Sequence, residues 1–159
     1  MTQKIRKCPK CYGALESQKL PVSSGEDGAL KLSVHDMPVL ECAKHHRLPV
    51  HGDFMIWLIQ EIRAREAQIA AGKEQGMLFK KHLCGECGKE LASKPEQRQA
   101  FPFDMTYAGM PPFRVEIDMP LYKCTGCGKN QIRSIKELHD HVPGAVVGIN
   151  DEAGFPHSG

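Results

Sequence analysis

Two Cys-x-x-Cys pairs constrain this sequence more than any other feature. Cys84 and Cys87 form one pair, and Cys124 and Cys127 form another further along the chain. Zinc prefers four ligands at tetrahedral angles, and each pair can supply two thiolates from one tight turn. A glycine follows the second cysteine of both pairs, where a backbone that turns back favours positive φ. We therefore predict a closed zinc site made of these four cysteines.

A second metal site is predicted in the first part of the chain. Cys8 and Cys11 form a third pair, and Cys42 follows a segment of alternating apolar residues. His45 repeats the spacing of the other pairs, so we predict it as the fourth ligand, with the adjacent His46 as the alternative. The chain would then bind two Zn²⁺ ions.

This assignment uses all seven cysteines of the chain. With no thiol left over, the pattern argues against a disulfide framework and favours a reducing, cytoplasmic compartment. The formal net charge is +2, and two zinc sites with deprotonated ligands would lower it to about −1. Net charge is therefore weak support for nucleic-acid binding. Because no apolar run approaches membrane-spanning length, we expect no membrane partner.

The expected fold is a small α+β metal-bound protein, with two zinc-ribbon-like β-hairpin modules joined by a central α-helix. Alternating apolar residues on both sides of a Gly/Asp-rich turn at 23–28 predict the first hairpin. Before both Cys42 and Cys124 the chain repeats an Asp-Met-Pro triplet, at 36–38, where it is expected to break the strand, and at 118–120. We interpret this as an internal repeat.

Four segments follow from this pattern. The first zinc ribbon covers 1–52, a linker helix capped by Asp53 covers 53–76, and the second ribbon covers 77–133. The last segment, 134–159, opens with a capping box at Ser134 and Glu137. Pro143 and Gly144 are expected to end that short helix, leaving an extended tail.

The first ribbon resembles the YgiT-type zinc finger, the metal-binding amino-terminal domain of MqsA-like antitoxins. The resemblance rests on Cys8-Pro9-Lys10-Cys11 and on the Met37-Pro38 pair shortly before Cys42. It covers roughly residues 7–47 and 83–129, as a tandem duplication, and implies zinc binding by the cysteines of both segments. Tyr12 replaces the usual glycine, and His45 replaces a cysteine. The helix-turn-helix domain through which such antitoxins bind operator DNA does not follow.

Closed sets of four ligands favour a non-enzymatic protein, because catalytic zinc keeps an open position. Glu86 is the nearest candidate acid or base, while His139 and His141 lack neighbouring ligands that would complete a site. We expect a protein-interaction module, subunit or regulator. Its partner would contact Phe54 and Trp57 of the central helix, or the Phe101–Phe113 aromatic loop, unless these side chains form the core.

Two alternatives remain open. A nucleic-acid-binding protein, such as a transcription regulator or an antitoxin relative, would use the aromatic loop together with basic residues. These basic residues are Lys4, Arg6, Lys7, Lys44, Arg47, Lys80 and Lys81. A rubredoxin-like electron carrier would hold iron at the four later cysteines.

Overall fold

A computed structural model describes residues 7–78 and 80–156. Its centre is one antiparallel sheet with the strand order β1-β2-β7-β6. The first hairpin consists of β1 (Glu16–Asp27) and β2 (Leu30–Glu41), and the second of β6 (Gln97–Met105) and β7 (Phe113–Lys123). Short strands β3 (Arg47–Pro49) and β8 (Asn130–Gln131) pair with β2 and β7. Because β2 pairs with β7, the two expected ribbons share one sheet instead of forming separate modules.

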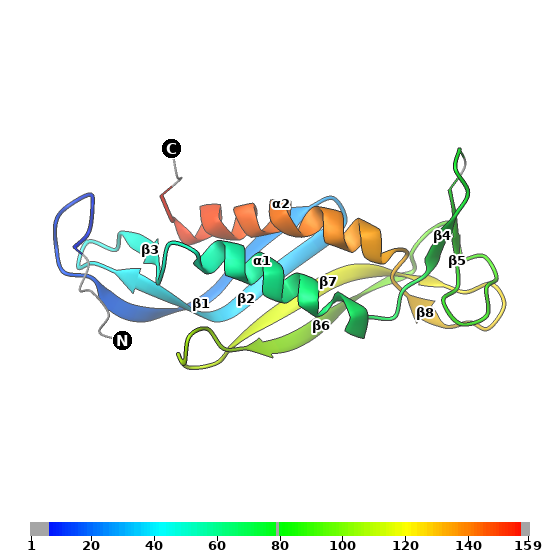
Figure 1. Ribbon diagram of the computed structural model, residues 1–159, viewed down its shortest axis with the longest axis horizontal. Helices are drawn as coiled ribbons and strands as arrows, with labels where there is room; N and C mark the ends of the chain where they lie inside the picture. The colour runs from blue at the N-terminus through cyan, green and yellow to red at the C-terminus, as the bar shows by residue number, and fades with distance from the viewer. Residues whose placement is uncertain (1–6, 79, 157–159) are drawn as a thin grey trace.

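Two of the described helices cover one face of this sheet (Figure 1). Helix α1 (Phe54–Ala64) buries Phe54, Leu58 and Ile62, spaced four residues apart along one side. Helix α2 (Ile135–Ala153) packs on β1, on β2 and against α1. Alternate strand residues point to the helices, so the core lies between sheet and helices. No described helix is both long and apolar enough to cross a membrane.

The second helix is much longer than the sequence suggested. The expected cap is present, since Ser134 Oγ accepts a hydrogen bond from the Glu137 N–H at 3.2 Å. Pro143 and Gly144 do not end the helix, which continues to Ala153 before Gly154 closes it in the left-handed region. The expected tail is therefore mostly helical and buries Ile149 in the core. The reason is tertiary packing, because α2 packs on β1 and its backbone at Ala145 and Ile149 lies close to Gly25.

The linker helix is shorter than expected. After α1 the chain forms the 3₁₀ helix η1 (Glu66–Gln68) and then a separate hairpin of β4 (Lys73–Gln75) and β5 (Lys81–Leu83). Asp53 stands at the start of α1 without a side-chain capping bond. Its Oδ1 instead accepts a hydrogen bond from the Tyr107 hydroxyl at 2.7 Å.

Three further details of the first hairpin and the aromatic segment differ from expectation. The Asp36-Met37-Pro38 triplet does not end β2, although Asp36 has a φ of 59°. Strand β1 continues through Gly25 to Asp27, so the turn is shorter than predicted. Much of the expected aromatic loop is strand β6, which lies at the sheet edge, where Pro102 is tolerated.

Candidate metal centres

Two groups of four side chains could each hold a metal ion, with all ligand atoms of a group within 4.8 Å of one another. The first group contains Cys8, Cys11, Cys42 and His46, and the second contains Cys84, Cys87, Cys124 and Cys127. The turns that carry them lie at opposite ends of the long axis of the molecule (Figure 1). In each group, two side chains come from the segment before a hairpin and two from the segment after it.

The second group matches the predicted four-cysteine site. The Sγ atoms of Cys84 and Cys127 are 3.7 Å apart, and those of Cys87 and Cys124 are 3.3 Å apart. A regular tetrahedron of thiolates around zinc has sulfur–sulfur distances of about 3.8 Å. All seven cysteines are free thiols. The spacing and the donor set therefore fit a tetrahedral metal ion.

The backbone of this group repeats one turn twice. Gly88 and Gly128 both have φ of +77° and donate N–H bonds to the carbonyls of Cys84 and Cys124 at 3.1 Å. The expected positive φ of these glycines is confirmed. The same turn brings backbone N–H groups onto the sulfurs, as with Gly126 N–H and Cys124 Sγ at 3.3 Å. Such bonds favour the thiolate, which is the form that binds metal.

Gln131 is a further contributor that the sequence did not reveal. Its Nε2 donates to Cys84 Sγ at 3.2 Å, and its Oε1 accepts the N–H of Gly85 at 2.9 Å. The side chain is buried and links strand β8 to the first turn of the site. The backbone N–H of Cys87 and then the Gln131 amide lower the pKa of the Cys84 thiol to about 6. A glutamine has no characteristic ligand spacing, so only the fold could identify it.

In the first group the side chain that lies with the three cysteines is that of His46, the alternative ligand, and not that of His45. His46 Nδ1 lies 3.4 Å from both Cys8 Sγ and Cys42 Sγ. The His45 side chain is 79% exposed and pairs with Glu41 at 2.7 Å. The first group therefore consists of three thiols and one imidazole, and that imidazole belongs to His46.

The physical reason for this correction is a shorter turn. In the other pairs the residue four positions after the first cysteine has positive φ and donates to that cysteine's carbonyl, as Tyr12 does at 2.7 Å. After Cys42 this role falls to His45, only three positions on, with φ of 64°. His45 thus occupies the position that Tyr12, Gly88 and Gly128 take elsewhere, and the next residue lies with the cysteines.

The other sequence candidates lie elsewhere. Phe54 is fully buried, as the alternative that it forms part of the core predicted. Trp57 is half-buried, with its ring 4.9 Å from Tyr107 and 6.0 Å from Phe113. The carboxylate of Glu86 forms an ion pair with Lys129. His139 and His141 pair with Glu66 and Asp27 at 3.1 and 3.0 Å.

The basic residues proposed for nucleic-acid binding are divided between two places. Lys7, Lys44 and Arg47 lie close in sequence to the ligands of the first group. Lys80 and Lys81 belong to the β4–β5 hairpin beside the second group, at the other end of the molecule (Figure 1). Lys4 and Arg6 lie outside the described residues. The described members of the set therefore do not form one continuous basic surface.

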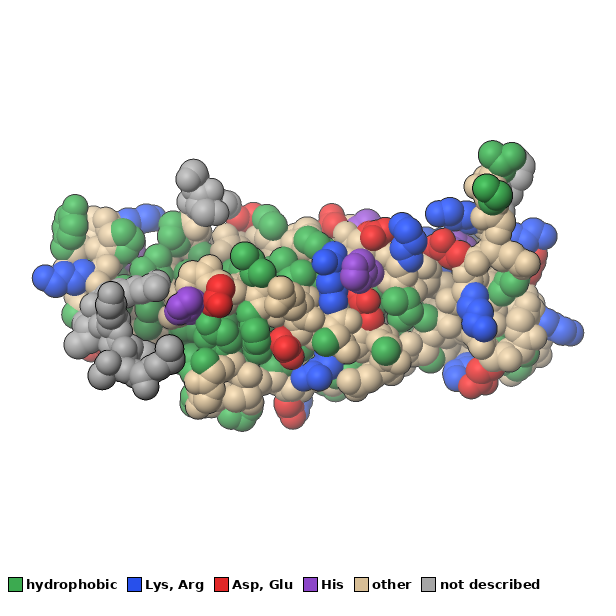
Figure 2. Space-filling model, viewed as in Figure 1, with side chains coloured by type: hydrophobic (Ala, Val, Ile, Leu, Met, Phe, Trp, Pro, Cys, Tyr) green, Lys and Arg blue, Asp and Glu red, His purple; other side chains and the backbone are tan. Residues whose placement is uncertain are grey.

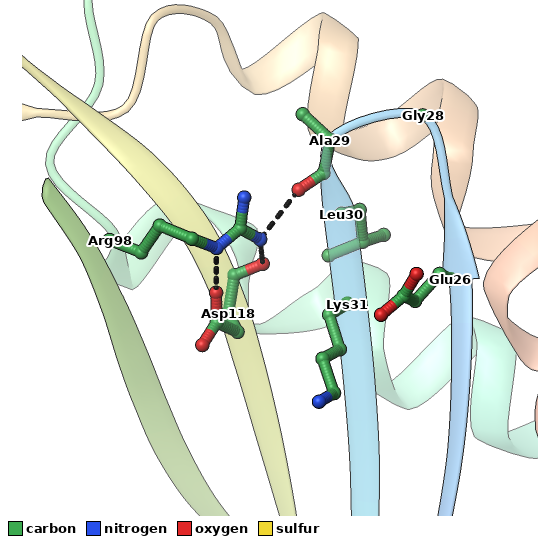
Figure 3. Close-up of a pocket in the computed structure, with 7 residues that line it drawn as sticks. All are labelled: Glu26, Gly28, Ala29, Leu30, Lys31, Arg98 and Asp118. Atoms are coloured by element: carbon green, nitrogen blue, oxygen red, sulfur yellow. Dashed lines mark hydrogen bonds and ion pairs between the residues drawn. The ribbon is translucent and has the colours of Figure 1, made fainter.

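A pocket of about 390 Å³ lies at the turn between β1 and β2 (Figure 3). Arg98 reaches from β6 across to this turn, donating to Asp118 Oδ1 at 2.6 Å and to the Ala29 carbonyl at 2.7 Å. The guanidinium is thus engaged in tying the edge strand to the turn. None of the predicted ligands lines this pocket.

A comparison of the chain with protein-family models gave no match, and comparisons with curated proteins and with solved structures gave none either. The resemblance to the YgiT-type zinc finger therefore stays a prediction. The two ligand groups carry the functional argument by themselves.

Proposed function

We propose that this chain is a non-enzymatic zinc protein that acts as a protein-interaction module, subunit or regulator. The observation that carries the proposal is the pair of four-ligand groups at opposite ends of one sheet. Four protein ligands leave no open coordination position, which is the arrangement of structural zinc. Bound zinc would therefore hold the ends of the two hairpins in place, and recognition would fall to the surfaces between them.

The order of elements supports an internal duplication as the origin of this arrangement. In each half a ligand pair precedes a hairpin, a second ligand pair follows it, and a helix comes next. The inner strands of the two hairpins run antiparallel, with Val34 opposite Val115. A duplicated unit of this kind buries its apolar sheet face by sharing one sheet and two helices.

Helix α1 offers the recognition surface that fits the proposal best. Ile56 is 62% exposed on its outer side, next to the half-buried Trp57. Trp57 is held by Tyr107 and Phe113, so a partner would meet a rigid aromatic edge.

Metal analysis and complex isolation test the proposal. We expect two zinc ions per chain, loss of the β structure on chelation, and recovery of a zinc-loaded complex from the native cell that I56D disrupts. Val147 is also exposed, on α2, and V147D is the matched control. One metal per chain, or zinc with an exchangeable water ligand and hydrolytic activity, would contradict it.

A second candidate is electron transfer at the all-cysteine group. The observation that favours it is the set of N–H groups directed at Cys84 and Cys124, since hydrogen bonds to sulfur tune the potential of iron sites. Purification of a red, iron-loaded protein with a reversible redox couple would support this function. A colourless protein containing zinc alone would exclude it.

A further inference from the structure

The β4–β5 hairpin stands apart from the main sheet. Its strands form a separate two-stranded sheet, from Lys73 opposite Leu83 to Gln75 opposite Lys81, and an isolated bridge joins Leu83 to Glu90. The hairpin projects from the end of the molecule that carries the second ligand group (Figure 1). The sequence pattern predicts a helix end and a ribbon start here, with Lys80 and Lys81 as candidate nucleic-acid contacts.

The turn of this hairpin exposes two adjacent large apolar side chains. Met77 is 98% exposed and Leu78 is 92% exposed, more than any other large hydrophobic residue described. Single exposed apolar residues are common on protein surfaces. Here two neighbours lie at the tip of a projection, where hydrophobic side chains stand clear of the body (Figure 2). An apolar tip in this position can contact another molecule or a lipid surface.

Exposed lysines flank the tip along the chain. Lys73, Lys80 and Lys81 are all exposed, and Lys80 and Lys81 each form an ion pair with a glutamate. Lys80 Nζ lies 3.6 Å from Glu74, and Lys81 Nζ lies 3.3 Å from Glu90. Exposed pairs of this kind are weak, so the ammonium groups can exchange their partners for other anions. Lysine stems can also lie along an apolar layer while the charge reaches its polar surface.

The hairpin is held by the main body and does not hang freely. Gly72 N–H donates to the Ile132 carbonyl and Leu91 N–H to the His82 carbonyl, both at 2.9 Å. Strand β5 runs directly into Cys84, the first ligand of the second group. The tip is therefore presented at a defined position beside the metal centre.

We propose that the Met77–Leu78 tip and its flanking lysines dock this protein onto an anionic phospholipid bilayer. An apolar projection inserts into a fluid acyl layer without needing a matching pocket, and the flanking ammonium groups complement lipid phosphates and carboxylates. Docking of this kind requires no spanning helix. It goes beyond the proposed function and does not depend on the identity of a protein partner.

Cosedimentation of the zinc-loaded full chain with lipid vesicles tests the inference. We expect binding to phosphatidylcholine vesicles containing phosphatidylserine, weaker binding to phosphatidylcholine alone, and weakening by salt. Replacing each apolar residue with serine, M77S and L78S, should reduce the partition coefficient about tenfold. K80Q with K81Q should reduce binding to the anionic vesicles and leave binding to neutral vesicles unchanged.

The matched control is V22S with V147S, which removes two exposed apolar side chains on β1 and α2, outside the hairpin. It should bind vesicles like the parent. Unchanged zinc content of all variants separates this test from that of the proposed metal role. Absence of vesicle binding, or binding that M77S and L78S leave intact, would overturn the inference. Tip-dependent binding to a protein without lipid binding would assign the hairpin to a protein partner instead.

Discussion

The side chain of Arg63 on α1 donates from Nη2 to the backbone carbonyl of His139 on α2 at 3.1 Å. That carbonyl lies four residues before Pro143, so its usual helical donor is missing. An arginine from the neighbouring helix thus supplies the hydrogen bond that proline removes. This contact helps to explain why α2 continues through a proline that usually marks a helix end.

We predict that R63M destabilises the protein by about 1 kcal/mol, the usual contribution of one hydrogen bond. In a P143A background the His139 carbonyl regains a helical N–H donor, so R63M should cost less there. Chemical denaturation of the four members of this double-mutant cycle measures the coupling. R65M is the control, because Arg65 forms a long ion pair with Glu61 at 3.8 Å and makes no hydrogen bond to a carbonyl of α2 among the described residues. Equal costs of R63M in both backgrounds would refute the explanation.

Gly25 should be essential for packing α2 on β1. A Cβ atom at this position would lie 1.9 Å from the Ala145 carbonyl oxygen. G25A should therefore force the helix away from the strand and cost about 3 kcal/mol. Thermal denaturation measures the loss, with G52A as control, since a Cβ there meets nothing within 4 Å. A stable G25A protein would mean that α2 is not seated as described.

His46 and His45 should differ sharply in metal binding. H46A removes one ligand from the first group and should release its metal under mild chelation. H45A removes only an exposed pair with Glu41 and should keep two ions per chain. Metal content after dialysis against a weak chelator distinguishes them. Retention by H46A together with loss in H45A would restore the original ligand prediction.

Gln131 should strengthen metal binding by the second group without touching the metal. Q131L removes the bonds to Cys84 Sγ and to the Gly85 N–H, and should weaken zinc affinity about 10–100-fold. Competition with a chromophoric chelator measures this affinity. The exposed neighbour Asn130 provides the control variant N130A. Equal zinc affinities in Q131L and the parent would make Gln131 a packing residue only.

Stability should fall at alkaline pH because of Tyr107. Burial and then the hydrogen bond to Asp53 raise the pKa of this phenol to about 12, whereas an unfolded tyrosine has a pKa of about 10. The contribution is therefore complete below pH 10 and is lost as the pH rises towards 12. Denaturation midpoints across this range should fall less in Y107F. Identical alkaline profiles would show that Tyr107 does not titrate with unfolding.

Much of the metal chemistry was predictable, because it depends on local spacing. The Cys-x-x-Cys pairs and their glycines form turns within a few residues, so the second ligand group follows from the sequence. His46 did not follow, since the turn after Cys42 is one residue shorter, and only its φ values and hydrogen bonds reveal this.

The sequence by itself determined the cysteine ligands, the two hairpins and the start of α2, because turns, caps and alternation are local. Only the tertiary structure decided that β2 pairs with β7 and that α2 continues past Pro143. Pro143 and Gly144 signal a helix end when read locally. In the folded chain Arg63 satisfies the carbonyl that the proline frees, and glycine at 25, 144 and 148 lets the helix approach β1 closely. These contacts join residues far apart in the chain, so no local pattern could encode them.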